Sequence, residues 1–249
     1  MVRIHHLPPL FLHETIRTTR RLNSVLRFRH IQTMNTSRRS AAGLLALLLL
    51  LAFLTGPSCP AADLQPGQAK VKAMLGQAQF SRAGAPFTPL GPGMVLRAGD
   101  LVQTASTSAV DLYFGEIVGT VRLTESATLI VDKLMVSDAD GFDVQLSLRG
   151  GELLGLAKPV PSDSRFEIKV SNGLAHVLQG RFRMDANGRM VVLEGKAIFA
   201  YVPPSGEASA HTLTAPPGVY FAPQEGVQPA SKELVREINK QVRAKLPRK

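Results

Sequence analysis

The chain has 249 residues, of which 45% are hydrophobic and 19% are charged, a balance typical of folded domains rather than of disordered protein. One cysteine and no tryptophan are present, which excludes an intrachain disulfide and a zinc site built from several cysteines. The net charge of +10 lies at the ends: residues 1–62 carry +7, residues 63–231 carry −2 and residues 232–249 carry +5. Because nucleic-acid binding needs a basic face on the fold itself, this distribution argues against DNA or RNA as a partner.

Residues 34–62 have the layout of a secretory signal peptide. Two arginines precede an uninterrupted apolar run over residues 41–54, and small residues follow it. A run of fourteen apolar residues suits a signal sequence, whereas a membrane-spanning helix needs about 20. We therefore expect bacterial-type export to the periplasm or the exterior, with cleavage after Ala61 or Ala62.

Alternatives to this leader remain open. A start at Met34 supplies a complete signal, so we interpret residues 1–33 as a basic preface from a mis-assigned start codon. The other interpretation is a basic cytoplasmic tail ahead of an uncleaved, single-pass inner-membrane anchor. Cys59 also allows lipid attachment, although Pro57 and the absence of an upstream Leu disfavour it.

Residues 63–222 show the pattern of one all-β domain. Short runs alternate between apolar and polar residues, and turn-forming residues separate them about every 8–12 positions. No helical periodicity interrupts this pattern. Strands are predicted over residues 109–114, 119–123, 128–131, 142–148, 152–156, 165–170, 174–178, 181–185, 190–193 and 197–202.

The turns between these runs indicate hairpins. Dipeptides of Asn or Asp followed by Gly are typical of type I′ turns, in which both residues have positive φ. They occur at Asp140-Gly141, Asn172-Gly173 and Asn187-Gly188. The expected fold is therefore all-β, a single two-layer β-sandwich or β-roll of short antiparallel strands, with a C-terminal amphipathic helix.

The helix is predicted within residues 231–249, after a proline-bearing linker at residues 223–230. Ser231 suits the N-cap, and basic residues gather toward the far end, as the helix dipole favours. Apolar residues recur at four-residue intervals, at Leu234, Ile238, Val242 and Leu246.

This helix has two possible roles. Its apolar stripe can dock on the sheet, which we favour. Its basic residues Lys240, Arg243 and Lys245 can also make a surface contact with an anionic lipid, a cell-wall polymer or an acidic protein.

Motifs for catalysis or for a cofactor are missing from the sequence, so we expect no enzyme activity and no cofactor, and a hydrolase or lyase is only a third alternative. His176 falls within a predicted strand, and His211 is expected to be exposed near a turn. Residues 137–143 hold three carboxylates and permit a calcium loop, but a solvated hairpin tip explains them equally well.

Short motifs in the β region occur in a characteristic order: Gly99-Asp100-Leu101-Val102-Gln103-Thr104, then Gly180-Arg181-Phe182, then Glu194-Gly195-Lys196-Ala197. This order resembles the FecR-type domain, the periplasmic part of iron-dicitrate sensor/regulator proteins. The resemblance covers residues 71–221. It departs at Arg181, where the family has Thr, and the Trp-containing cytoplasmic segment of the family's sigma regulators has no counterpart.

The resemblance implies fold determinants and no binding site. We expect Asp100 to bond the backbone amides that follow it in a tight turn, and Thr104 to close a strand. Gly180 and Gly195 are expected at bends where backbones approach closely, with Phe182 in the core. Glu194 belongs to the same motif as Gly195.

The sequence thus predicts a stand-alone, exported FecR-like domain. The expected function is a non-enzymatic interaction module of the cell envelope, binding an envelope protein or an anionic envelope polymer. Contact with a membrane is expected only through the signal segment or through a weak peripheral contact. The alternative is a membrane-anchored FecR-like regulator that responds to an external stimulus.

Overall fold

The computed structural model describes residues 64–137, 139–216 and 218–244. The expected leader over residues 1–62, with the cleavage residues Ala61 and Ala62, lies outside the described residues, and so does Lys245. Within the described part, no helix is long and apolar enough to cross a membrane.

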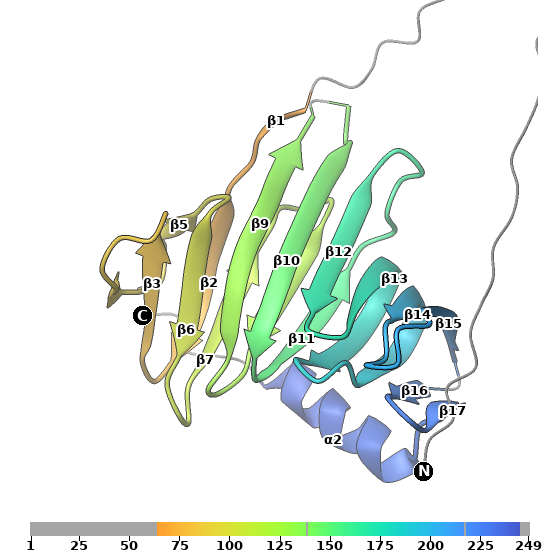
Figure 1. Cartoon of the computed structure of the whole chain (residues 1–249). Helices are drawn as coiled ribbons and strands as arrows, with labels where there is room; N and C mark the ends of the chain where they lie inside the picture. Colours follow the sequence, from red (N-terminus) through yellow and green to blue (C-terminus); the bar gives the residue numbers. More distant parts are fainter. Residues whose placement is uncertain (1–63, 138, 217, 245–249) are drawn as a thin grey trace, which may run out of the picture. The chain divides into compact units, whose positions relative to one another are not determined.

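Strands contain 58% of the described residues, and an α-helix follows them, so the expected β-rich body with a C-terminal helix is confirmed. The strands are β1 (Gln65–Pro66), β2 (Ala69–Leu75), β3 (Ala78–Arg82), β4 (Thr88–Pro89), β5 (Val95–Leu96), β6 (Asp100–Thr104), β7 (Ala109–Tyr113), β8 (Gly119–Leu123), β9 (Thr128–Val136), β10 (Phe142–Gly150), β11 (Glu152–Ala157), β12 (Arg165–Val170), β13 (Gly173–Asp185), β14 (Met190–Tyr201), β15 (Ser209–Ala215), β16 (Val219–Ala222) and β17 (Gly226–Pro229). The helix is α2 (Lys232–Arg243) (Figure 1).

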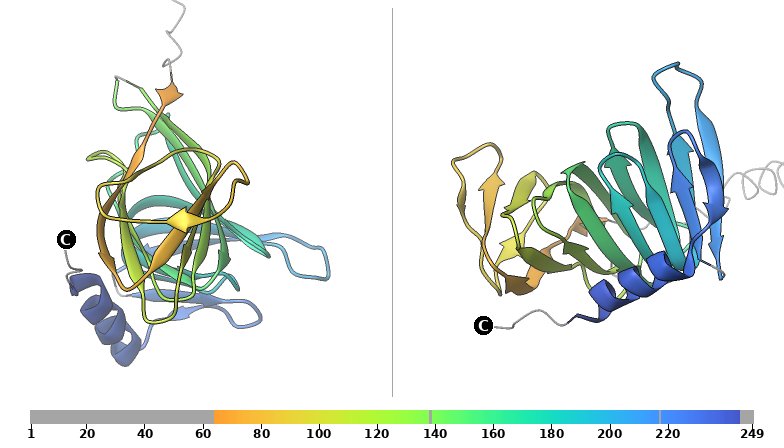
Figure 2. Two further views of the ribbon diagram at one scale, coloured as in Figure 1. Left: turned by 90° about the vertical axis from the view of Figure 1, so that its left-hand side faces the viewer. Right: turned by 90° about the horizontal axis from the view of Figure 1, so that it is seen from below.

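The strands form one strongly curled sheet whose two arms wrap around the core (Figure 2). The first arm has the order β4–β3–β6–β9–β10–β12, and the second has the order β5–β2–β7–β8–β11. Both arms end on β13, which pairs with β12 through its first half and with β11 through its second half. On one side, β14 pairs with β13. On its other side, β14 pairs with β16 along its first half and with β15 along its second half, and β17 pairs with β16.

The expectation of a two-layer sandwich or roll of short antiparallel strands is wrong in its details. The sheet is continuous, and it is mixed because β10 and β12 are parallel. The predicted runs 174–178 and 181–185 are one strand of 13 residues, β13, and the runs 190–193 and 197–202 are essentially one strand of 12 residues, β14. Because these strands bend instead of ending, the two arms stay hydrogen-bonded in one sheet.

The bend lies at a pair of glycines. Gly180 and Gly195 are direct partners in the β13–β14 ladder, with φ of 108° and 93°, and the register shifts on both sides of them. A Cβ on Gly180 would fall far inside van der Waals contact with the carbonyl oxygen of Glu194, and a Cβ on Gly195 would do the same with that of Gln179. The backbones therefore approach more closely here than any residue with a side chain permits.

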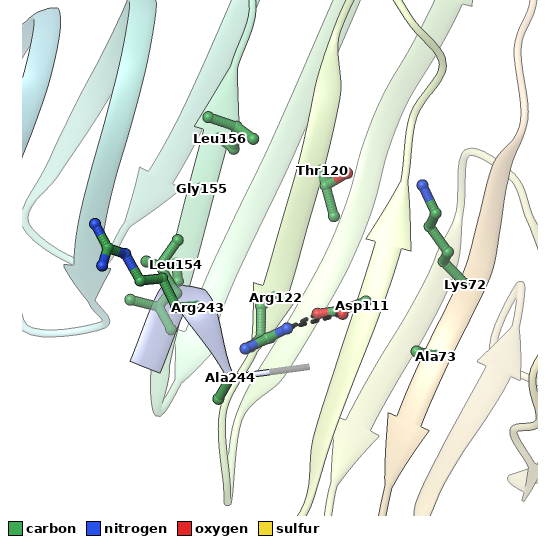
Figure 3. A pocket seen from close by; sticks show the side chains of 11 residues that line it. Lys72, Ala73, Asp111, Thr120, Arg122, Leu154, Gly155, Leu156, Arg243 and Ala244 are labelled. Carbon is green, nitrogen blue, oxygen red and sulfur yellow. Dashed lines mark hydrogen bonds and ion pairs between the residues drawn. The ribbon is translucent and has the colours of Figure 1, made fainter. Parts of the chain in front are cut away.

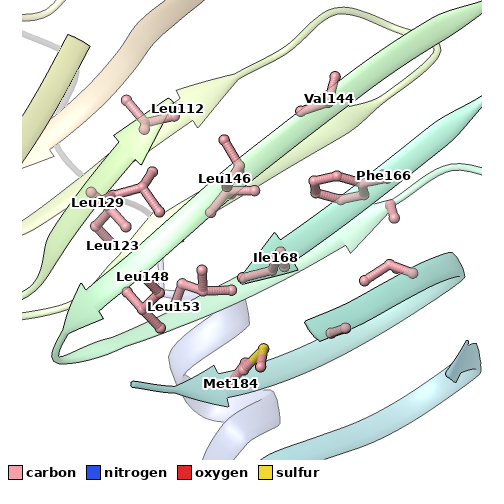
Figure 4. Packing of buried hydrophobic residues seen from close by; sticks show 14 of the residues in the cluster. Leu112, Leu123, Leu129, Val144, Leu146, Leu148, Leu153, Phe166, Ile168 and Met184 are labelled. Atoms are coloured by element: carbon pink, nitrogen blue, oxygen red, sulfur yellow. The ribbon is translucent and has the colours of Figure 1, made fainter. Parts of the chain in front are cut away.

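The core fills the space enclosed by the curled sheet (Figure 4). Alternation directs one face of each strand inward: in β12, Phe166, Ile168 and Val170 are buried, while the residues between them point outward. Phe182 also lies in this core, 1% exposed, and meets Phe166 edge to face with ring centroids 6.3 Å apart.

The Gly99-Asp100 turn is held by a buried carboxylate. Both oxygens of Asp100 accept hydrogen bonds from Arg82 of β3, at 2.9 and 2.8 Å, and one also accepts from the Arg97 amide at 2.9 Å. The expectation that Asp100 bonds the amides after it is therefore wrong, since this amide precedes it. Burial alone would raise the pKa of the Asp100 carboxyl, but the hydrogen bonds from Arg82 and Arg97 outweigh burial and lower the pKa.

Thr104 is the last residue of β6. Its hydroxyl donates to the Thr124 carbonyl at 2.6 Å and accepts from the Ala127 amide at 2.8 Å. The side chain thus ties the end of β6 to the turn between β8 and β9.

The three predicted turn dipeptides lie at the β9–β10, β12–β13 and β13–β14 connections. Their expected type I′ geometry is wrong. Only Asp140, with φ of 62°, and Gly188, with φ of 83°, have positive φ among the six residues, whereas a type I′ turn requires it at both central positions.

Replacing Gly180 by Val is expected to lower the free energy of unfolding by about 1–3 kcal/mol, because the new side chain meets the Glu194 carbonyl. Gly206→Val is the control: its φ is 95°, but nothing lies within 4 Å of its Cβ position, so it adds backbone strain without a clash. Chemical denaturation measures both. Equal losses in the two variants would contradict the close approach at Gly180.

Asp100→Asn is expected to lower the free energy of unfolding at pH 7 by about 1–3 kcal/mol, through loss of charge-assisted hydrogen bonds. Because the pKa of Asp100 is lowered on folding, its contribution is complete above the unfolded pKa of about 3.9 and is lost as the pH falls through the folded pKa. Denaturation curves between pH 7 and pH 2 should therefore converge for the variant and wild type. Asp140→Asn, at an exposed carboxylate, is the control and should leave stability at pH 7 unchanged.

Candidate functional site

Helix α2 is formed by capping and by a buried apolar side chain. The Ser231 hydroxyl accepts a hydrogen bond from the Leu234 amide at 3.1 Å, an N-cap, and Glu233 lies in the first turn. Ile238 is fully buried against three side chains on the outer face of the sheet, Leu154, Val191 and Leu193. The helix therefore docks on the sheet, as its apolar stripe predicts.

Arginines of the sheet fix the position of the helix. Arg122 of β8 forms two hydrogen bonds to Asp111 of β7, at 2.6 and 2.9 Å (Figure 3). Its third nitrogen donates to the Gln241 carbonyl at 2.7 Å. This carbonyl belongs to the last turn, whose acceptors have no partner within the helix. Two residues before Gln241, the side-chain oxygen of Asn239 accepts a hydrogen bond from Arg181 at 3.2 Å.

The exposed face of α2 carries a row of cations, which we call the basic stripe. Lys232, Arg236, Lys240 and Arg243 recur at intervals of four, four and three residues, so they lie along one side of the helix. All four are exposed, and none forms an ion pair with another described residue. With Gly218, Ala230, Val235, Asn239 and Ala244 they line an open groove of about 1100 Å³.

A second groove, the helix-end groove, begins where the basic stripe ends. It has a volume of about 520 Å³ and lies over β2, β7, β8 and β11 (Figure 3). Lys72, Leu156 and Arg243 line it, and Leu156 is 47% exposed. Arg243 and Ala244 border both grooves, which makes them one continuous surface.

Charge on this surface is predominantly positive. Asp111 is the acidic residue that lines the helix-end groove, and Arg122 neutralises it. Lys72 and Arg243 are thus left without an acidic neighbour in the groove. The surface can attract an extended anion and offers apolar contact at Leu156.

The other candidate residues from the sequence lie elsewhere. Glu194 is exposed on β14 and pairs with Arg181 at 2.9 Å. His176 lies in β13 as expected, 3.9 Å from Glu167. His211 does not lie at a turn: it is in β15, half-buried, with its ring 4.8 Å from that of Phe221.

The described acidic side chains of residues 137–143 do not gather into a metal site. Asp143 pairs with Lys133 at 2.7 Å, Asp140 is exposed, and Asp138 lies outside the described residues. Among the residues that the structure describes, no group of three His, Cys, Asp or Glu side chains could hold a metal ion.

Sequence reasoning identified Lys240 and Arg243 but missed Lys232 and Arg236, although their four-residue spacing was visible in the chain. It also missed Lys72, which only the fold brings near the helix end. Comparison with known proteins adds no further guide: no family model, no curated protein and no solved structure matches the chain.

Ile238→Asp is expected to lower the free energy of unfolding by about 2–5 kcal/mol, because it removes the buried side chain and places an unpaired charge beneath the helix. Glu237→Asp is the control, since it places the same residue at the neighbouring exposed position. Thermal melts of both variants measure the effect. An unchanged melt for Ile238→Asp would show that the helix does not need this contact.

Proposed function

We propose that this chain is an exported, non-enzymatic interaction module of the cell envelope, with a FecR-like β domain that binds an anionic envelope polymer through the basic stripe. The observation that carries the proposal is the row of four exposed cations on a docked helix. Docking uses the opposite, apolar face and accounts for none of these charges. The row is therefore free to meet a partner.

The distribution of charge supports an anionic partner. Residues 63–231 have a net charge of −2, whereas residues 232–249 carry +5. Helix α2 supplies +2 of this, from four cations and two glutamates, and residues 244–249 supply +3, so positive charge is concentrated in the C-terminal segment. Attraction between exposed charges acts over about 10 Å at 0.1 M salt, which suffices to steer a polyanion onto this face.

Geometry favours a polymer over a small anion. A helix rises about 1.5 Å per residue, so the twelve residues of α2 span about 18 Å. The helix-end groove extends the same surface across four strands of the second arm. A chain that carries a negative charge at regular intervals can contact several cations at once, which a small anion cannot.

Neutralising Lys240 and Arg243 together with Gln is expected to weaken binding to anionic cell-wall fragments by about tenfold or more, at about 1 kcal/mol for each charge near an anionic surface. Thermal stability should not change, because both side chains are exposed and unpaired among the described residues. Co-sedimentation at low and high salt measures binding, and vesicles of anionic lipid serve as the competing target.

The matched control is Lys169→Gln with Lys196→Gln, two exposed sheet residues whose loss changes the net charge equally. Equal loss of binding in both double variants would show a response to overall charge and would contradict a site on the helix. Binding to lipid vesicles but not to wall fragments would replace the polymer by a membrane surface.

A further inference from the structure

The edges of the sheet are not equally protected. An edge strand exposes unpaired N–H and C=O groups, and proteins limit the resulting association with short strands, charges or proline. Edge strands β4, β5 and β17 have two to four residues each, and both β4 and β17 contain a proline, Pro89 and Pro229. These edges are poor templates for another strand.

Strand β15 lacks each of these protections. It has seven residues, Ser209–Ala215, with neither a charged residue nor a proline among them. All seven pair with β14, and no other described strand is hydrogen-bonded to β15. The β14–β15 hairpin also projects beyond the rest of the sheet, which leaves this edge accessible (Figure 2).

Beside β15, aromatic side chains at the end of the core are only partly covered. The ring of Phe221, which is buried, contacts the ring of His211 at 4.8 Å and that of Tyr201 at 5.7 Å between centroids. Tyr201 and His211 are themselves only half-buried. A further strand along β15 would cover these two aromatic side chains and extend the core.

From these observations we propose that β15 is the pairing edge for a second copy of this chain, in an antiparallel β15–β15 contact whose two-fold axis passes through Thr212. In this register Ala210 lies opposite Thr214, and His211 lies opposite Leu213. Because β15 contains no Asp, Glu, Lys or Arg, this pairing places no like charges opposite each other. The two Thr212 residues face each other, a pair that is favourable across antiparallel strands. The contact uses one patch on both copies and closes on itself.

The composition of the edge favours a second copy over a different protein. A foreign strand is usually selected by charges or by pockets for alternate side chains. The outward residues of β15 are small and uncharged: Ala210, Thr212 and Thr214 are all exposed. A second copy of β15 would place its own small residues beside these on the outward face. On the inward face it would place His211 and Leu213 beside the same two residues of the first copy.

Sedimentation equilibrium of the chain over a range of concentrations tests the proposal. Wild type is expected to dimerise, and Thr212→Lys is expected to raise the dimer dissociation constant at least tenfold, because two lysines then face each other at the axis. Thr212 is exposed, so the thermal melt should not shift. Gln228→Lys, which adds the same charge to the protected edge β17, should dimerise as wild type does.

A mixture fixes the register. Thr212→Lys and Thr212→Glu should each be monomeric alone and should form a heterodimer together, since opposite charges then meet at the axis. A wild type that stays monomeric, or a dimer that Thr212→Lys leaves intact, would overturn the proposal. A mixture of the two variants that stays monomeric would also overturn it, and so would a wild type that associates only when a foreign peptide is added.

Discussion

The architecture depends on the close approach of two backbones at Gly180 and Gly195. At this point β13 and β14 bend without losing their pairing, because neither residue has a Cβ to occupy the space between the chains. The bend lets β13 accept β12 along one half and β11 along the other.

The curl determines where the helix can dock. Inward residues of the sheet fill the core, so the apolar residues on its outer face need a separate cover: Leu154 of β11, and Val191 and Leu193 of β14. Helix α2 provides that cover with Ile238, and Arg122 fixes its last turn. Since the apolar face of α2 is committed inward, helical geometry directs the basic stripe outward.

Local patterns predicted local structure well. The strands at residues 119–123 and 165–170 were predicted with the bounds that the structure has, because alternation reports which side chains are buried. The curl was not predictable in this way. Gly180 and Gly195 were correctly expected at close approaches of the backbone, but the runs on either side of them were interpreted as separate strands, because alternation does not show whether a strand bends or ends. The parallel pairing of β10 with β12 depends on the route of β11 between them, which no local signal encodes.

The same distinction holds for the candidate site. The basic stripe follows from helical spacing and lies within one segment, so the sequence contains all of it. The helix-end groove combines Lys72 with Arg243, and Arg122 contacts Gln241 across a separation of 119 residues. Such contacts arise only when the sheet has curled and the helix has docked.

Association through β15 would change what the basic stripe can bind. A dimer carries two stripes, and a partner that spans both gains the effective concentration of the second contact after making the first. A small anion cannot span two sites, whereas a long polymer can. Dimerisation would therefore raise affinity for the polymer while leaving the affinity of each stripe for a small anion unchanged. The two surfaces are physically independent, since α2 and β15 lie on different parts of the sheet (Figure 1). Under the proposed function, their effects on polymer binding would therefore multiply.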